Sequence, residues 1–384
     1  MEVVGFPKGT NGKGVGMYEI TRRDFIISSA AAAAVLGLNG RLVFIGTAHA
    51  QKAMEQGFHR YKVGAIEVTA LFDGIWEKPH DPAFIKNATV DETKAALAAA
   101  GLPTDFVLVP FTPNVVRAGG RIVLVDTGTG GGQTGGPKAG TLMKHLAAAG
   151  IDADAVNVIL ISHFHPDHIY GLMTKAPENK AVFPNAEILV PAAEYKFWMD
   201  PALIEKLPEA RRPLAKRIQE MFPLMKDKVR QFEGDKELVP GIRPIEAHGH
   251  SPGHTAFHVS SGKDQLIVLG DTSHIPALFV RNPGWHAAFD QDATVAEATR
   301  RKLLDRVVAD QIMVTGYHFP FPAVGTIAKD GKGYAFKPIW AGARPSSVRP
   351  PSFSLEVPPH GRGEKAYFPL TATPPPAYRR TKLT

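Results

Sequence analysis

The sequence predicts an α/β (α+β) protein in which two mixed β-sheets pack together and helices lie outside them. Three observations predict this fold class. Short apolar runs rich in β-branched residues come mostly in pairs separated by turns, as strands in hairpins do. Stretches typical of helices lie between groups of strands rather than after every strand, which disfavours a regularly alternating βαβ sheet. The 384 residues include no cysteine, so stability has to come from a hydrophobic core rather than from disulfides.

The first half of the chain predicts hairpins and one capped helix. Residues 63–72 alternate apolar and polar side chains and end at a turn, Asp73-Gly74, so we expect one opening strand there. A helix is expected from Val90 onward, closed by Gly101. Gly119-Gly120 is expected to be a hairpin turn. The other strands expected in this half are residues 106–109, 114–117 and 121–125.

The second half predicts further strands separated by helices. Helices are expected at residues 141–149, at 209–228, where the pattern is charged and amphipathic, and at 292–309. Pro191 is expected at the first position of another helix, because proline is favoured there. The strands expected in this half are residues 157–161, 187–190, 242–247, 255–260, 265–269 and 311–315.

Residues 1–50 are interpreted as a targeting signal. Thr21-Arg22-Arg23-Asp24-Phe25-Ile26 is a twin-arginine pattern, and the apolar residues 26–38 behind it are too few to span a membrane. Ala48-His49-Ala50 is a small-x-small cleavage site, so the mature chain is expected to begin near Gln51. We therefore expect a periplasmic or secreted protein exported by the twin-arginine route. An N-terminal anchor or a buried helix is the alternative.

The two ends of the chain carry its excess positive charge. The formal net charge is +7, of which +2 falls on residues 1–50 and +5 on residues 341–384, so residues 51–340 are neutral. The basic composition is therefore no argument for binding nucleic acid. Residues 341–384 hold nine prolines and have little periodicity, which is typical of a disordered tail or a surface strap. We predict a folded domain at 51–340, no membrane span and no nucleic-acid partner; a homodimer is left open.

Residues 162–168 concentrate three imidazoles and a carboxylate in one loop. The loop follows an expected strand, and ligand sites of open α/β sheets lie at the carboxyl ends of strands. His163 and His165 alternate, so both point to one side of an extended chain, and Asp167 and His168 follow where the chain turns. Nitrogen and oxygen donors at this spacing suit Zn²⁺ or, less specifically, Fe or Mn. A His-rich surface loop is the alternative, which the donors elsewhere in the chain disfavour.

Further donors stand at the ends of other expected strands. These are Val125-Asp126-Thr127-Gly128, His248-Gly249-His250-Ser251-Pro252-Gly253-His254-Thr255, Leu269-Gly270-Asp271-Thr272 and Thr315-Gly316-Tyr317-His318-Phe319-Pro320. Residues 130–135 also fit G-x-G-x-x-G, but the glycines begin several residues beyond the strand end, where a dinucleotide would need them. We interpret this segment as a Gly-rich loop beside the metal site.

These motifs, in this order, resemble those of the metallo-β-lactamase-fold hydrolases over roughly residues 60–340. The resemblance implies a four-layer αββα sandwich and two divalent metal ions, with Zn²⁺ as first choice and Fe, Mn or Co as alternatives. The ligands it implies are His163, His165 and His254 for the first ion, Asp167, His168 and His318 for the second, and Asp271 as the bridge between them. Asp126 would support the ligand loop from behind. His250 is interpreted as a hydrogen-bonded supporting residue.

Two such ions, about 3.5–4 Å apart, would share a hydroxide that attacks a carbonyl or phosphoryl group. The candidate catalytic residues are Asp167 and Asp271, and Asp167 can also accept or donate a proton. For His248, His274 and His286 an ordinary structural role is favoured over one in the pocket.

Within the family, several runs are similar to methyl parathion hydrolase and related exported lactonases: Lys196-Phe197-Trp198, Pro240-Gly241-Ile242, and Gly331-Lys332-Gly333-Tyr334 with Phe336 and Pro338. This implies the hydrolysis of lactones, esters or phosphotriesters. Since residues 51–340 are neutral, we expect an uncharged substrate held by an aromatic wall. The candidate pocket residues are Phe164, Trp198, Phe279, Trp285 and Phe319.

The leading prediction is a dinuclear-metal hydrolase that opens lactones or cleaves esters, of the acyl-homoserine lactone type, with an organophosphate hydrolase as the alternative. A β-lactamase of the commonest dizinc type uses a cysteine ligand, which this chain lacks, although a cysteine-free type stays open. Export disfavours a hydroxyacylglutathione hydrolase. Di-iron reductases of this fold carry Glu where His165 stands and need a flavin domain. A non-catalytic metal-binding protein would be expected to have lost a ligand.

Overall fold

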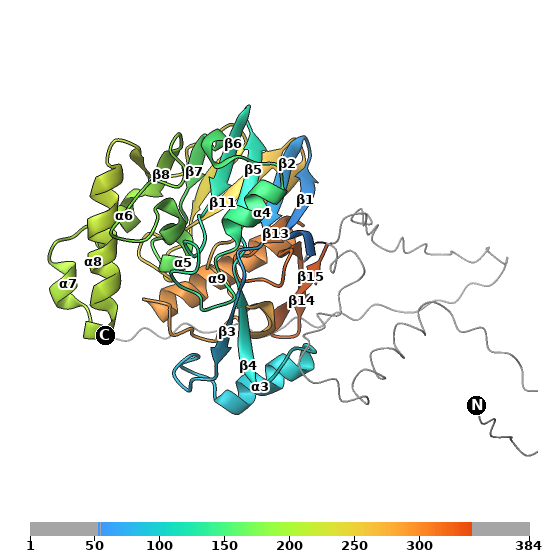
Figure 1. Cartoon of the computed structure of the whole chain (residues 1–384). Coiled ribbons are helices and arrows are strands. Elements are labelled where there is room, and N and C mark those ends of the chain that lie inside the picture. Colours follow the sequence, from blue (N-terminus) through green and yellow to red (C-terminus); the bar gives the residue numbers. More distant parts are fainter. Residues whose placement is uncertain (1–52, 54, 340–384) are drawn as a thin grey trace, which may run out of the picture. The chain divides into compact units, whose positions relative to one another are not determined.

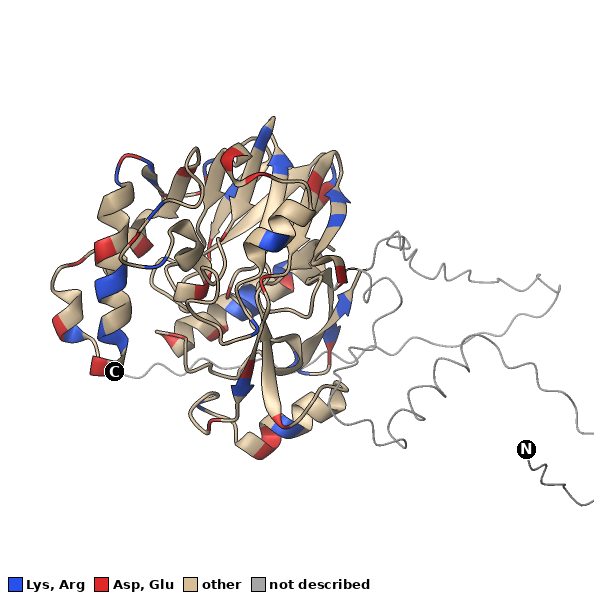
Figure 2. Ribbon diagram, viewed as in Figure 1, with Lys and Arg blue, Asp and Glu red and all other residues tan. Residues whose placement is uncertain are grey.

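Two β-sheets facing each other form the middle of the fold (Figure 1). In this computed structural model the described residues are 53 and 55–339. The predicted twin-arginine signal and the predicted Pro-rich tail lie outside the described residues. No helix within the described part of the chain is long and apolar enough to cross a membrane. Lys and Arg are interspersed with Asp and Glu over the described elements (Figure 2).

The first sheet has seven strands in the order β1-β2-β5-β6-β7-β8-β9. Its strands are β1 (Phe58–Val63), β2 (Ile66–Leu71), β5 (Asn114–Ala118), β6 (Arg121–Val125), β7 (Val158–Leu160), β8 (Glu187–Pro191) and β9 (Val229–Phe232). Pairing is antiparallel from β1 to β6 and parallel from β6 to β9. The sheet is therefore mixed, as predicted.

The second sheet has six strands in the order β10-β11-β12-β13-β14-β15. Its strands are β10 (Ile242–Glu246), β11 (Thr255–Ser261), β12 (Asp264–Val268), β13 (Met313–Thr315), β14 (Val324–Asp330) and β15 (Gly333–Pro338). All pairs are antiparallel except β12 with β13. A separate two-stranded ribbon, β3 (Ile75–Pro79) with β4 (Phe106–Pro110), lies beside helix α3 (Val90–Ala99) at one end of the fold (Figure 1).

Helices cover the outer face of each sheet, which completes the predicted four-layer αββα sandwich. They are α4 (Leu142–Ala148), α5 (Pro166–Ile169), α6 (Ala192–Trp198), α7 (Leu203–Lys206), α8 (Arg212–Met221) and α9 (Ala293–Ala309). The short strand β7 shows how the layers form. Ile159 packs in the cluster beneath α4, α6 and α8, while Val158 and Leu160 pack in the cluster between the two sheets. A strand buried on both faces is apolar throughout, as its sequence indicates. Helix α9 packs on the second sheet.

Several elements differ from the sequence prediction. The expected single strand at 63–72 is the second half of a hairpin, because Gly64 adopts a positive φ of 57° and turns the chain. The expected long helix at 209–228 is α-helical only over α8, with 3₁₀ turns before it and after it. Pro223 lacks the N–H that would continue the helix. Pro191 is the N-cap of α6 rather than its first residue.

Strands β1, β3, β9, β14 and β15 were not predicted. For the last two a sequence signal exists, because Asp330-Gly331 is a turn dipeptide and Gly331 has a φ of 59° between them.

Candidate metal centre

The predicted donors meet at one edge of the sandwich. Each follows a strand: Asp126 follows β6, residues 163–168 follow β7, His250 follows β10, Asp271 follows β12 and His318 follows β13. Strands β6 and β7 run parallel, as do β12 and β13. Strand β10 runs in the same direction as β12, because both pair antiparallel with β11. The carboxyl ends within each sheet therefore lie on the same side, where the two sheets bring their loops together.

A first group of donors consists of His163 Nε2, His165 Nδ1, His250 Nε2 and Asp271 Oδ2. The three imidazole nitrogens lie 2.8, 3.0 and 3.2 Å from one another. The Asp271 oxygen is 3.2 Å from the nitrogen of His250 and 3.8 Å from that of His163. A tetrahedral zinc with bonds of 2.0–2.1 Å needs donors separated by about 3.3 Å. The group therefore has the dimensions of a four-coordinate site.

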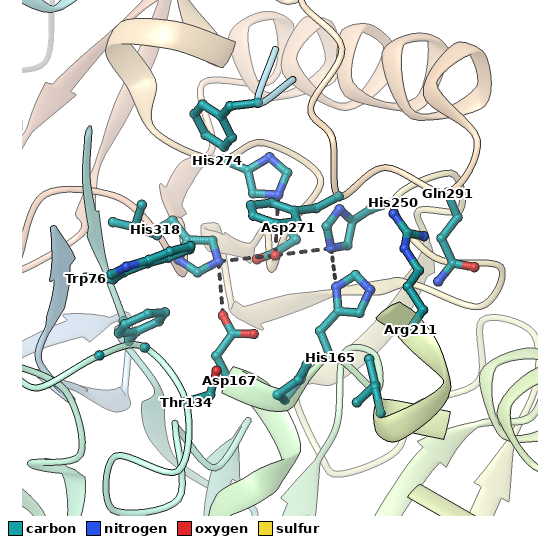
Figure 3. Close-up of a pocket in the computed structure, with 18 of the residues that line it drawn as sticks. Trp76, Thr134, His165, Asp167, Arg211, His250, Asp271, His274, Gln291 and His318 are labelled. Atoms are coloured by element: carbon teal, nitrogen blue, oxygen red, sulfur yellow. Dashed lines mark hydrogen bonds and ion pairs between the residues drawn. The ribbon is translucent and has the colours of Figure 1, made fainter. Parts of the chain in front are cut away.

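A second group consists of Asp167 Oδ2, His168 Nε2 and His318 Nε2. The Asp167 oxygen is 3.6 Å from the nitrogen of His168 and 3.4 Å from that of His318. Asp271 reaches this group too, because its Oδ1 lies 3.4 Å from His168 and its Oδ2 lies 3.2 Å from His318. Figure 3 shows the Asp271 carboxylate between His250 and His318. This is the position that a bridging ligand needs.

The buried atoms of the two groups fit cations. His168 Nε2 and Asp271 Oδ1 have no hydrogen-bond partner within the described chain. Burial and neighbouring histidines hold the pKa of His163 well below its usual range, so its nitrogen is neutral. Burial opposes protonation of His250 as well, but the Asp271 and Asp290 carboxylates outweigh it and raise the pKa to about 9. Lone pairs that converge beside carboxylates form a site for positive charge.

Asp126 lies where it was predicted, behind the ligand loop. Its Oδ1 accepts the backbone N–H of Ser162 at 2.8 Å, and its Oδ2 accepts the Ser162 hydroxyl at 2.8 Å. The same Oδ2 lies 2.8 Å from His168 Nδ1. If this ring nitrogen donates, the other ring nitrogen presents its lone pair to the site. His318 is oriented in the same way, because its Nδ1 lies 2.8 Å from the carbonyl oxygen of Pro110.

The structure exchanges the roles predicted for His250 and His254. His254 Nδ1 lies 3.0 Å from the carbonyl oxygen of Ala247, and its Nε2 accepts the backbone N–H of Asp271 at 2.9 Å. Both ring nitrogens are therefore occupied, and His254 belongs to neither donor group. His250 instead presents Nε2 to the first group, while its Nδ1 lies 2.9 Å from Asp290 Oδ1. The prediction of His254 as a ligand and of His250 as a supporting residue is corrected accordingly.

Two further buried residues that the sequence analysis missed stand behind His250. Asp290 Oδ2 accepts a hydrogen bond from the Arg300 guanidinium at 3.1 Å, and both side chains are fully buried. Arg300 also donates to the carbonyl oxygens of Thr272, Pro283 and Trp285. The pair holds the His250 ring through Asp290. No sequence pattern connects these residues to the donor groups, because Asp290 stands in a loop and Arg300 in the middle of α9.

The donor groups open into a pocket of about 460 Å³. Its walls are mostly apolar and include Trp76, Phe84, Val109, Phe111, Trp198, Leu207, Leu214, Ile275 and Phe289. Thr134, Gly135 and Gly136 also line it, so the Gly-rich loop lies beside the donors, as predicted. Arg211 and Gln291 are polar lining residues, and Figure 3 shows them near His165 and His250. The wall is thus largely apolar, but Arg211 adds a positive charge to it.

Of the five aromatic residues predicted for the pocket, Trp198 lines it. The other four pack in hydrophobic cores instead. Phe164 stacks on Phe222 at a centroid distance of 4.2 Å, because strand-like alternation turns it away from its two histidine neighbours. Phe319 packs against Phe336, and Phe279 and Trp285 pack in the cluster beneath α3. Besides Trp198 on α6, the aromatic residues of the wall are Trp76 on β3 and Phe84, Phe111 and Phe289 in loops.

His274 is a buried polar residue that lines the pocket. It is 5% exposed, and neither ring nitrogen has a hydrogen-bond partner within the described chain. Its Nε2 lies 3.4 Å from Asp271 Oδ2. The structural role that the sequence favoured for His274 is therefore corrected. An imidazole in this position can form a hydrogen bond with an oxygen atom of a bound molecule.

A family model described as "Metallo-beta-lactamase superfamily" matches residues 114–313. An N-acyl homoserine lactonase of Bacillus cereus is 28% identical over 164 residues, which cover 42% of this chain and 55% of that protein. The N-acyl homoserine lactonase AiiA of Bacillus thuringiensis subsp. kurstaki is 27% identical over 163 residues, 42% of this chain and 56% of that one. The chain thus matches about half the length of these curated relatives.

Two solved structures are similar over most of their own length. AidC, described as a dizinc quorum-quenching lactonase in complex with a product, has a TM-score of 0.69 and 28% identity, covering 74% of this chain and 97% of that one. The hydrolase AbOPH, described as being in the beta lactamase superfamily, has a TM-score of 0.67 and 26% identity, with the same coverage.

Proposed function

The chain belongs to the metallo-beta-lactamase superfamily, and from this premise we propose that it is a dinuclear-metal hydrolase that opens lactones or cleaves esters of the acyl-homoserine lactone type. One observation carries the proposal: two donor groups that share Asp271 open directly into a largely apolar pocket. The similarity to AidC over 97% of that lactonase supports the substrate class. Zinc is the proposed metal, because imidazoles and carboxylates at these distances suit it.

Two divalent ions in these groups would supply Lewis-acid polarisation of the scissile carbonyl and activation of water. The residues of the chain do the rest. Asp126 and Asp290 orient the His168 and His250 rings through hydrogen bonds. Asp167 lines the pocket and is the carboxylate placed to accept a proton during hydrolysis. His274 offers a hydrogen bond to a substrate oxygen, and the apolar walls bind the acyl part of the substrate and exclude water.

We expect activity toward lactones to rise with the length of the acyl chain. Each methylene buried against the pocket wall contributes roughly 0.8 kcal/mol, which corresponds to about a fourfold increase in kcat/KM per methylene while the pocket has room. The measurement is a hydrolysis panel on purified, metal-loaded protein that includes acyl-homoserine lactones, aryl esters, a phosphotriester and a β-lactam. Metal analysis of the same protein should give close to two equivalents per chain.

Trp76→Ala is the matched variant for this panel, because Trp76 lines the pocket without belonging to a donor group. The variant should flatten the dependence on chain length and leave the metal content unchanged. A flat dependence in the parent protein would contradict the proposed acyl-binding role of the wall. Turnover of the phosphotriester or the β-lactam far above that of lactones and esters would overturn the proposed substrate class.

We also propose that the protein is exported by the twin-arginine route, on the strength of Arg22-Arg23 and the apolar run behind them. Changing both residues to lysine should leave the full-length protein in the cytoplasm, because the pair is the recognised part of the signal. Cell fractionation with immunoblotting measures this, and an unrelated exported protein without this pair serves as control. A double variant that still reaches the periplasm in full would show that the segment is a different kind of signal.

A further inference from the structure

Glu194 is a fully buried carboxylate on α6 that belongs to neither donor group. It accepts four hydrogen bonds. Its Oε1 accepts the backbone N–H of Phe164 at 2.9 Å and the indole N–H of Trp198 at 2.7 Å. Its Oε2 accepts the hydroxyl of Ser251 at 2.7 Å and the backbone N–H of Gly253 at 2.8 Å. Both carboxylate oxygens are thus satisfied by donors from three separate segments.

These three segments are parts of the candidate site. Phe164 stands between His163 and His165, so the hydrogen bond from its backbone N–H holds the loop after β7. Ser251 directly follows His250, so the hydrogen bonds from Ser251 and Gly253 hold the loop after β10. Trp198 lines the pocket, and its ring lies edge-on to that of His165 at a centroid distance of 6.3 Å. One side chain therefore connects the two loops of the first donor group with the pocket wall.

Gly253 allows α6 to pack closely against the His250 loop. A Cβ atom at this position would lie 2.1 Å from the backbone nitrogen of Glu194. Only glycine lets the helix come near enough for the Gly253 N–H to reach the carboxylate. A backbone hydrogen bond from Thr255 to Ser162, 3.0 Å long, joins the same two loops closer to their strands. Glu194 adds a second connection beside the ligands themselves.

We propose that Glu194 is a positioning residue that sets the separation of the His163–His165 loop from the His250 loop and thereby the geometry of the first metal site. This inference rests on the metal centre proposed above. An ionised carboxylate suits the role, because it only accepts hydrogen bonds and all four of its partners are donors. Burial raises the pKa of Glu194, while the four donors counteract that effect. Replacing one carboxylate oxygen of Glu194 with an NH₂ donor is therefore the informative substitution.

Glu194→Gln should loosen one loop selectively. If the amide NH₂ replaces Oε2, the Ser251 hydroxyl can rotate and accept from it, and one donor, the Gly253 N–H, loses its acceptor. If it replaces Oε1, the donors of Phe164 and Trp198 both lose theirs. The first orientation leaves one donor without an acceptor, whereas the second leaves two. We therefore expect the variant to keep the Phe164 and Trp198 hydrogen bonds and to release the His250 loop.

The test measures the affinities of the full chain for two Co²⁺ or Zn²⁺ ions by competition with a chelator, together with the Co²⁺ absorption spectrum. His250→Ala and His318→Ala, each lacking a donor of one group, assign the two binding steps. In Glu194→Gln we expect the affinity of the first site to fall about 10- to 100-fold, as for other residues that orient metal ligands, with the second site unchanged. Saturating metal should restore most of kcat. Trp198→Phe, which removes only an Oε1 donor, should leave the affinity of the first site near the parental value.

Asp73→Asn is the matched control, because Asp73 is an equally buried carboxylate that accepts hydrogen bonds from Thr129 and Leu142, outside the donor loops. It should lower the melting temperature without changing either metal affinity. If Glu194→Gln behaves like this control, Glu194 is structural only and the inference is wrong.

If Glu194→Gln does not fold, Ser251→Ala is the second variant, because it removes one Oε2 donor and leaves the carboxylate in place. It should weaken metal binding at the first site in the same direction. An unchanged affinity of the first site in Ser251→Ala would overturn the inference. A parent protein that binds fewer than two ions would contradict the proposed metal centre instead.

Discussion

Replacing Asp271 with alanine is expected to lower kcat/KM for lactones by at least about a thousandfold while the fold survives. The reason is geometric: one carboxylate approaches both donor groups, lying 3.2 Å from His250 and 3.2 Å from His318. Its removal takes a ligand from both sites at once, whereas loss of a residue that only orients a ligand typically costs 10- to 100-fold. The fold should persist, because the backbone N–H of Asp271, which His254 accepts, remains in the variant.

Metal analysis, circular dichroism and kinetics on the same preparation check this prediction. The variant should hold one equivalent of metal or less, with an unchanged far-ultraviolet spectrum. Asp264→Ala is the matched control, because Asp264 begins the same strand β12 at an exposed position and should leave activity and metal content unaltered. A variant of Asp271 that keeps two equivalents and more than a tenth of the activity would show that this carboxylate is no bridge.

His250→Ala and His254→Ala are expected to have opposite consequences. The first variant should lose one equivalent of metal and at least about a hundredfold in kcat/KM, because His250 Nε2 faces two other imidazoles and the Asp271 carboxylate. The second should keep both ions and lose stability. His254 is fully buried, and burial with the nearby His250 lowers its pKa to about 3, so its neutral ring can accept a hydrogen bond from the Asp271 backbone.

Truncation of His254 leaves that N–H, and the carbonyl oxygen of Ala247, without a partner. Each unsatisfied buried group costs about 1–3 kcal/mol, so thermal unfolding of the metal-loaded His254→Ala protein should begin at a clearly lower temperature. Metal analysis and melting curves of the two variants, side by side with the parent, decide the assignment. Loss of one equivalent in His254→Ala together with retention of both in His250→Ala would reinstate the ligand set inferred from the sequence.

The similarity between His250 and His254 in the sequence explains why their roles were exchanged. Both lie in one turn between two strands, and no periodicity indicates which ring faces the other sheet. The loop after β7 poses no such difficulty. His163 and His165 alternate along extended backbone, and Asp167 and His168 begin a helix, so neighbouring residues settle which way these side chains point. The same alternation could have shown that Phe164 points into the core.

What the sequence determined by itself is local in origin. Apolar runs that end near Asp126, His163 or Asp271 identify strands with polar residues at their carboxyl ends. Such patterns depend on short-range sterics and on hydrophobic burial. The αββα sandwich and the family follow from the order of these motifs, and both are confirmed.

What only the tertiary structure decided depends on contacts between distant segments. The pocket wall is built from Trp76 and Phe111, which precede all donor residues in the chain, and from Phe289, which stands between Asp271 and His318. Packing of the two sheets brings these residues together. Arg300 reaches His250 through Asp290, and Glu194 on α6 accepts hydrogen bonds from two loops that carry donor residues. Such contacts leave no periodic trace in the chain, because they depend on how loops from different strands close over one edge of the sandwich.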